Sequence, residues 1–185
     1  MKEEKWNEDS CLISAVRRYH LKEQGYYRGF SEEEISLHSV GHRLAFQVCL
    51  TIFTLGLVLT NIPILVVAGL LAFFGVVLPW HPVDYLYNSV IRHWLDRPKL
   101  PPRSSQGKFA CSIATVWIAL VIFLFATSHF LAGYILGGIM FLIAFLVSTT
   151  DICIPSKIYN YLFLRKKIRI DEPSGNVFSS RNTPE

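Results

Sequence analysis

Two long stretches of the chain lack charged side chains. Residues 44–80 contain no Asp, Glu, Lys, Arg or His, and residues 109–150 contain only His129 among these types. Charged residues make up 17% of the chain and apolar residues 51%, whereas a typical soluble domain is about 25% charged. This deficit of charged residues argues against an ordinary soluble domain and indicates a chain that lies largely within a lipid bilayer.

Each uncharged stretch is about twice as long as one membrane span, since a helix needs about 20 apolar residues to cross the bilayer core. Turn-forming residues divide each stretch near its middle, at Thr60–Pro63 and at Thr127–His129. The predicted spans are residues 44–60, 63–80, 108–127 and 130–150. The first span is short, so the first hairpin could instead be a re-entrant loop.

Lys and Arg are absent from both predicted turns. All 18 lie before the first span, between the two hairpins or after the last span. The positive-inside rule places these three segments in the cytoplasm, and an even number of spans also puts both termini on one side. We therefore expect an all-α integral membrane protein with four transmembrane helices as two tandem hairpins. Its expected location is the bacterial cytoplasmic (inner) membrane, with both termini cytoplasmic. No secretory signal peptide is expected.

The segments outside the hairpins predict further helices. Residues 84–96 place apolar side chains at helical spacing, as in an amphipathic helix on the membrane surface, and residues 157–169 repeat the pattern. In the N-terminal arm we expect one helix over residues 10–23 and another from Ser31, with a capping box to Glu34. The predicted regions are the arm (1–43), the first hairpin (44–80), an interfacial helix with a Pro-rich connection (81–107), the second hairpin (108–150), and an interfacial helix with a polar tail (151–185).

Aromatic and small residues predict contacts with lipid and between helices. The aromatic side chains expected at the headgroup layer are those of Trp80, Tyr87, Trp94 and Tyr159. On the last span, Gly133, Gly137 and Gly138 form a small-residue face that lets helices approach closely. This face packs either within the chain or against another subunit.

The two hairpins end on similar sequences. Tyr87-Asn88 follows His81 at the same offset at which Tyr159-Asn160 follows Cys153. This pattern indicates a duplicated hairpin in which both copies enter the membrane from the same side. The alternative is a chance match between apolar strings.

Two short motifs flank the second hairpin. Pro101-Pro102-Arg103 and Phe109-Ala110 precede it, and Cys153 and Tyr159 follow it. With these motifs the chain resembles, over residues 38–164, a family of small bacterial membrane proteins catalogued only as a domain of unknown function. The resemblance implies two helical hairpins and no established activity.

The motif after the second hairpin departs from that of the family. The family motif is Cys-x-x-Cys-Glu-x-Tyr, and here Ser156 and Lys157 replace the second cysteine and the glutamate. A Cys-x-x-Ser segment cannot form a disulfide within itself, so the thiol-redox role that the motif implies is in doubt for this chain. Cys153 is still the candidate for a reactive thiol, because a cation such as Lys157 can lower a thiol pKa. An inert buried cysteine is the commoner outcome, and we expect no structural disulfide.

The histidines offer few ligand sets. His38 and His42 have the i, i+4 spacing of metal ligands on a helix, but two histidines beside the headgroups are commoner, and we expect no metal site. No histidine lies at the centre of a predicted span, where a haem would be held. His42 and His81, at the span ends, are the candidates for binding a cofactor, which would be a lipid or a peripheral pigment.

No catalytic constellation stands out, and the absence of charge within the spans argues against transport or proton relay. The sequence therefore predicts a non-enzymatic accessory or assembly subunit of a larger membrane complex. Its expected partners are membrane lipids and other membrane-protein subunits, and no nucleic acid. The alternative is a membrane thiol-redox or sulfur-handling protein that acts through Cys153.

Overall fold

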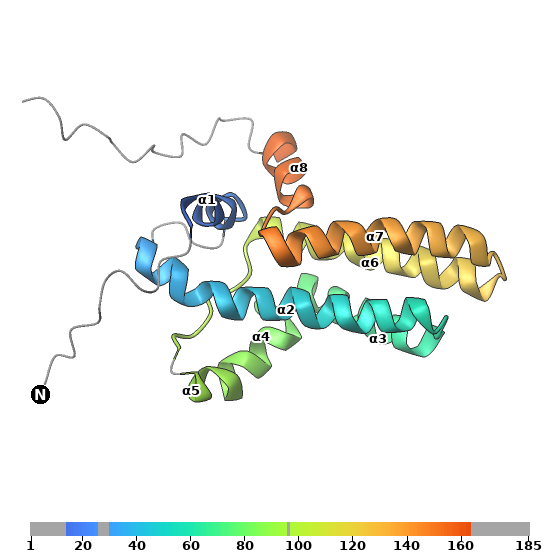
Figure 1. Ribbon diagram of the computed structural model, residues 1–185, viewed down its shortest axis with the longest axis horizontal. Coiled ribbons are helices and arrows are strands. Elements are labelled where there is room, and N and C mark those ends of the chain that lie inside the picture. Colours follow the sequence, from blue (N-terminus) through green and yellow to red (C-terminus); the bar gives the residue numbers. More distant parts are fainter. Residues whose placement is uncertain (1–13, 26–29, 96, 164–185) are drawn as a thin grey trace, which may run out of the picture.

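The computed structural model describes residues 14–25, 30–95 and 97–163, whose regular structure is entirely helical (Figure 1). The helices are α1 (Ala15–Glu23), α2 (Glu32–Val58), α3 (Ile62–Val77), α4 (Pro82–Leu86), α5 (Arg92–Trp94), α6 (Ser105–Ala126), α7 (Phe130–Thr150) and α8 (Ile154–Phe163), with a π-helical turn η1 (Tyr87–Ile91) between α4 and α5. In the described part of the chain, α2, α6 and α7 are each long and apolar enough to cross a membrane. Helix α3 and the 82–94 segment make a fourth span if they are counted together. The chain is therefore a multi-pass membrane protein, and the predicted all-α fold is confirmed.

Helix α2 is longer than predicted and α3 is shorter. Helix α2 has 27 residues, or about 40 Å at 1.5 Å per residue, so the helix expected from Ser31 and the first span are one continuous helix. Helix α3 has 16 residues, or about 24 Å. It ends before Leu78 because a residue that precedes a proline, here Pro79, is disfavoured in a helix. The chain then bends by 79° into the 82–94 segment. The shorter helix of the first hairpin is therefore α3. The expectation that the first span, now part of α2, is the short one was wrong.

Local capping fixes the ends of these helices as the sequence indicates. At the start of α2, the Glu34 N–H donates to the Ser31 hydroxyl at 3.2 Å, and the Ser31 N–H donates to the Glu34 carboxylate at 2.8 Å. At the first turn, the Asn61 side chain accepts from the Ile64 N–H at 3.1 Å. Thr60 and Ser128 have left-handed backbones, with φ of 49° and 62°. The capping box and both hairpin turns are therefore confirmed.

An apolar cluster between the long helices joins the two hairpins. Its buried residues are Phe53 and Leu57 of α2, Leu65, Ala68 and Ala72 of α3, and Ile118, Val121 and Phe125 of α6. Partly buried side chains of α7 pack against the cluster, among them Leu136 and Met140. The second hairpin therefore lies against the first along most of the length of α3 and α6 (Figure 1).

Two of the three glycines on α7 pack within the chain. A Cβ added to Gly133 would collide with the Phe125 ring of α6, and one added to Gly137 would collide with Leu57 of α2. A Cβ at Gly138 would meet no atom within 4 Å. Intramolecular packing therefore explains Gly133 and Gly137, and Gly138 faces away from the other helices.

The segment after α3 differs from the single amphipathic helix predicted over residues 84–96. It begins at Pro82 and passes through the π-helical turn. Tyr87 is 1% exposed, and its ring lies against Gly41 of α2, where a Cβ would be 2.7 Å from the ring. The expectation that the Tyr87 side chain lies at the headgroup layer was therefore wrong, because a glycine on α2 opens a place for it inside the protein. Trp94, by contrast, is 85% exposed.

The remaining surface predictions concern Trp80, Tyr159 and the outer helices. Trp80 is half-buried, and its indole N–H donates to the Leu100 carbonyl at 3.1 Å. Tyr159 is half-buried beside Phe163 on α8. Helix α8 starts before the predicted 157–169 helix, and residues after 163 lie outside the described part. Likewise α1 starts later than the predicted 10–23 helix, whose first residues are not described.

Helices α1 and α8 lie at the same end of the two hairpins, opposite both turns (Figure 1). We call this end the polar end. It gathers the start of α2, the end of α3, the start of α6 and the end of α7. Side chains that are far apart in the sequence therefore meet there.

Candidate functional site: a cysteine pocket at the polar end

Three cysteines from separate elements line one cavity at the polar end. They are Cys49 of α2, Cys111 of α6 and Cys153, which directly precedes α8. His81 and Arg103 also line the cavity, which has a volume of about 230 Å³. We call this site the cysteine pocket and define it by these five residues. The other lining side chains are apolar, and they come from both hairpins and from α8.

A glycine on α3 makes room for the pocket. A Cβ at Gly75 would lie 2.7 Å from His81 Cδ2 and 2.9 Å from Cys111 Sγ. Both distances are shorter than any ordinary contact of a Cβ atom. Only glycine at this position lets His81 and Cys111 approach α3 as closely as they do.

Arg103 is the buried cation of the pocket. Its Nη1 donates to Cys111 Sγ at 3.5 Å, and its Nε donates to Asp84 Oδ2 at 3.0 Å. The side chains of Arg103 and Asp84 are only 3% and 7% exposed. Loss of one partner from such a buried pair leaves an uncompensated charge, at a cost of about 3–5 kcal/mol. The pair therefore fixes the Pro-rich connection against the start of α4.

His81 presents a hydrogen-bond donor to the pocket. Its Nδ1 accepts from the Val83 backbone N–H at 3.2 Å, so the ring hydrogen is on Nε2. With Nδ1 acting as an acceptor, the ring is the neutral tautomer. Its Nε2–H lies 3.6 Å from Cys49 Sγ and donates toward that sulfur.

Cys153 is 5% exposed, and burial raises the pKa of its thiol, an effect that Ser156 partly offsets. Lys157, which the sequence suggested as an activating cation, is 48% exposed and lies 3.8 Å from the Glu23 carboxylate. At neutral pH Cys153 is therefore a buried neutral thiol.

Cys111 is the thiol that accepts a hydrogen bond from Arg103, and both Cys111 and His81 lie against Gly75. Sequence reasoning singled out Cys153 and missed the other two. The sequence did offer one indication of the other two. Cys49 and Cys111 each lie only a few residues into a predicted span, counted from the end next to the charged segments, so both could be expected at the same depth in the membrane.

His38 and His42 form hydrogen bonds to different groups in the structure. The Nδ1 of His38 lies 2.6 Å from the Glu34 carbonyl and its Nε2 lies 3.2 Å from the Lys99 carbonyl. His42 Nε2 pairs with the Gln24 side-chain oxygen at 3.0 Å. Within residues 14–25, 30–95 and 97–163, no group of three or more His, Cys, Asp or Glu side chains is arranged to hold a metal ion.

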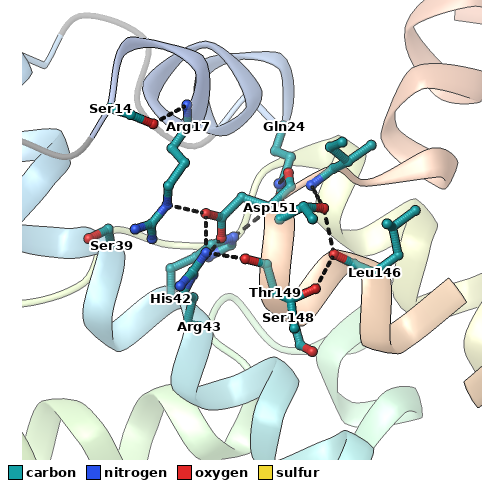
Figure 2. A network of polar contacts seen from close by, with 12 residues as sticks. Ser14, Arg17, Gln24, Ser39, His42, Arg43, Leu146, Ser148, Thr149 and Asp151 are labelled. Carbon is teal, nitrogen blue, oxygen red and sulfur yellow. Dashed lines mark hydrogen bonds and ion pairs between the residues drawn. The ribbon is translucent and has the colours of Figure 1, made fainter. Parts of the chain in front are cut away.

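A polar network beside the pocket ties the N-terminal arm to the end of α7 (Figure 2). Its centre is Asp151, which is 2% exposed and has a left-handed backbone, with φ of 60°. Arg17 Nε donates to its carboxylate at 2.8 Å, and Arg43 donates to the same carboxylate at 3.0 and 2.8 Å. The Gln24 amide donates to the Asp151 carbonyl at 2.7 Å. Helix α1 is thereby held against the polar end.

The pocket and most of the fold fall within one known family. Residues 39–163 match the family described as "Domain of unknown function (DUF4395)". The chain belongs to the DUF4395 family. None of the curated proteins and none of the solved structures matches it. Membership of a family with no known function, predicted over residues 38–164, is thus confirmed.

The family match covers all five pocket residues of this DUF4395 protein and leaves out α1. Among the candidates from the sequence, the pocket contains Cys153 and His81. His42 lies nearby, in the network between Gln24 and Asp151. The pocket therefore holds both the cysteine that we expected to be reactive, Cys153, and one of the histidines that we expected to bind a cofactor, His81.

Proposed function

We propose that this DUF4395 protein is a membrane thiol-redox protein whose working groups are the thiols of the cysteine pocket. One observation carries the proposal: Cys49, Cys111 and Cys153 come from three separate elements and line the same apolar cavity. Core packing alone does not require three sulfur atoms in one place. Thiols that meet across helices can instead exchange protons and electrons with each other.

The reaction we propose is reversible disulfide formation between Cys111 and a neighbouring pocket cysteine. Two S–H bonds break, one S–S bond forms, and two protons and two electrons leave to an acceptor. The attacking species is a thiolate, and Arg103 lies beside Cys111 to balance its charge. In this arrangement the partner of Cys153 comes from another helix, so Ser156 at the position of a second motif cysteine does not remove it.

Peptide mapping without reduction tests the proposal. Treatment of the folded, detergent-solubilised protein with diamide, a soluble thiol oxidant, should give a disulfide that joins Cys111 to Cys49 or Cys153. Cys111→Ser should abolish this disulfide, because it removes the thiol beside Arg103. Cys11→Ser, at a cysteine outside the described residues, is the matched control and should leave the disulfide unchanged. Three free pocket thiols after oxidation would refute the proposal.

Several expectations from the sequence stay predictions beside this proposal. They are the accessory-subunit role, the partner subunits, the bacterial origin, the cytoplasmic placement of the polar end and the duplicated hairpin. The subunit role rested partly on the α7 glycines, and Gly133 and Gly137 are now explained by contacts within the chain. A defined partner that co-migrates after gentle extraction would support that role.

A further inference from the structure

We infer that the cysteine pocket receives the ring of a membrane-soluble quinone, which accepts the two electrons of the pocket thiols. The inference rests on the proposed function and names its electron acceptor. It follows from three properties of the cavity: its size, its apolar walls and the position of its polar groups.

The size of the cavity suits one ring rather than a whole cofactor. Its volume of about 230 Å³ is below the about 300 Å³ at which pockets for drug-sized ligands begin. The walls include Phe53 of α2, Trp117 of α6 and Ile143 of α7, so both hairpins contribute. A molecule with a small ring and a long apolar tail can place the ring in the cavity and leave the tail among lipids. A charged, water-soluble oxidant would lose its hydration in such a site.

The polar groups of the pocket distinguish a quinone from a lipid acyl chain. His81 presents an Nε2–H whose present acceptor, Cys49 Sγ at 3.6 Å, is a weak one. A quinone has carbonyl oxygens that accept hydrogen bonds well, whereas an acyl chain has no acceptor along its length. The same donor lies beside the thiols that supply the electrons. Donor and thiols together therefore favour a ligand that is both a carbonyl acceptor and an oxidant.

The redox step balances with these groups. Cys111 and one neighbouring cysteine lose two protons and two electrons and form one S–S bond. The quinone takes up the two electrons and two protons and becomes a quinol. His81 acts as a positioning residue that donates a hydrogen bond to one quinone oxygen.

A single-turnover experiment tests the inference. Reduced protein in lipid nanodiscs is mixed without oxygen with a fully substituted decyl benzoquinone, which offers no free ring position to a thiol. We expect quinol and the Cys111 disulfide to form in equal amounts. Ala144→Phe should fill the cavity and slow quinol formation by about tenfold or more. Ala132→Phe, on an exposed part of the same helix, is the matched control and should react like the unmodified protein.

Diamide oxidation of the same samples separates the outcomes. If diamide forms the disulfide in all variants and only Ala144→Phe is slow with quinone, the inference is supported. If diamide forms the disulfide but the quinone is not reduced, or if both Phe variants react alike, the quinone inference fails and the proposed function stands. A tightly bound phospholipid that the quinone does not displace also refutes it. If neither oxidant forms a disulfide, both proposals fail.

Discussion

At the scale of single residues, Gly75 determines how the pocket is built. It lies on α3 opposite His81 and Cys111, and any side chain there would overlap both groups. The chain has 11 glycines, and nothing in the sequence around this one marks it as different. Its importance comes from what other segments place against it.

Gly75→Ala should therefore disturb the pocket directly. The added methyl group would lie within 3 Å of His81 and Cys111, and overpacking of this kind typically costs about 1–3 kcal/mol. We expect a lower unfolding temperature in detergent and faster alkylation of Cys111. Gly69→Ala is the control on the same helix, because a Cβ there would lie 3.4 Å from Ile118. Equal behaviour of the two variants would contradict this account.

At the scale of elements, the sequence predicts those helix ends and turns that depend on residues close together in the chain. The capping box at Ser31 and the turn at Asn61 follow from residues within a few positions of each other, and both are present. The early end of α3 depends on Pro79 and could have been read from the sequence. The positions of Cys49 and Cys111 relative to Cys153 depend on how two hairpins and α8 pack, which no short segment specifies.

The docking of α1 is also decided between elements, and Asp151→Asn tests it. Asparagine tolerates the left-handed backbone of this position, so the change removes charge without adding strain. Arg17 and Arg43 would lose a carboxylate partner. The free energy that docks α1 against the end of α7 should then become less favourable by about 1–3 kcal/mol. Hydrogen exchange of the α1 amides should then become faster. The control is Lys157→Gln, which removes a long, exposed ion pair with Glu23 and should change this exchange little. If both variants speed the exchange of the α1 amides equally, the Asp151 network does not hold α1.

At the scale of the whole molecule, the two ends of the bundle differ in charge. In sequence, all Lys and Arg lie before the first hairpin, between the hairpins or after the second, and the two turns carry none; those in the described residues lie toward the polar end. This distribution predicts that the pocket opens near the cytoplasmic face and that the turns lie outside. The redox partner of the thiols would then be in the membrane, because the cytoplasm keeps protein thiols reduced.

Labelling of introduced cysteines checks this orientation. In intact cells, a maleimide that does not cross membranes should label Thr127→Cys in the second turn, which is exposed. His93→Cys, exposed near the polar end, should react only after the cells are made permeable. The unmodified protein is the control for reaction at its own cysteines. The reverse pattern would invert the orientation.

The bonds that hold α1 also set an order of events during synthesis. Helix α1 leaves the ribosome first, yet its partners are made later: Ser104 donates to the Gln24 carbonyl, Asp151 accepts from Arg17, and Asn160 donates to the Glu23 carbonyl. Helix α1 can pack against α2 early, through Leu21 and Ile35, but these three bonds can form only after the second hairpin and α8 have been made. The polar end is therefore completed only once α8 has been made.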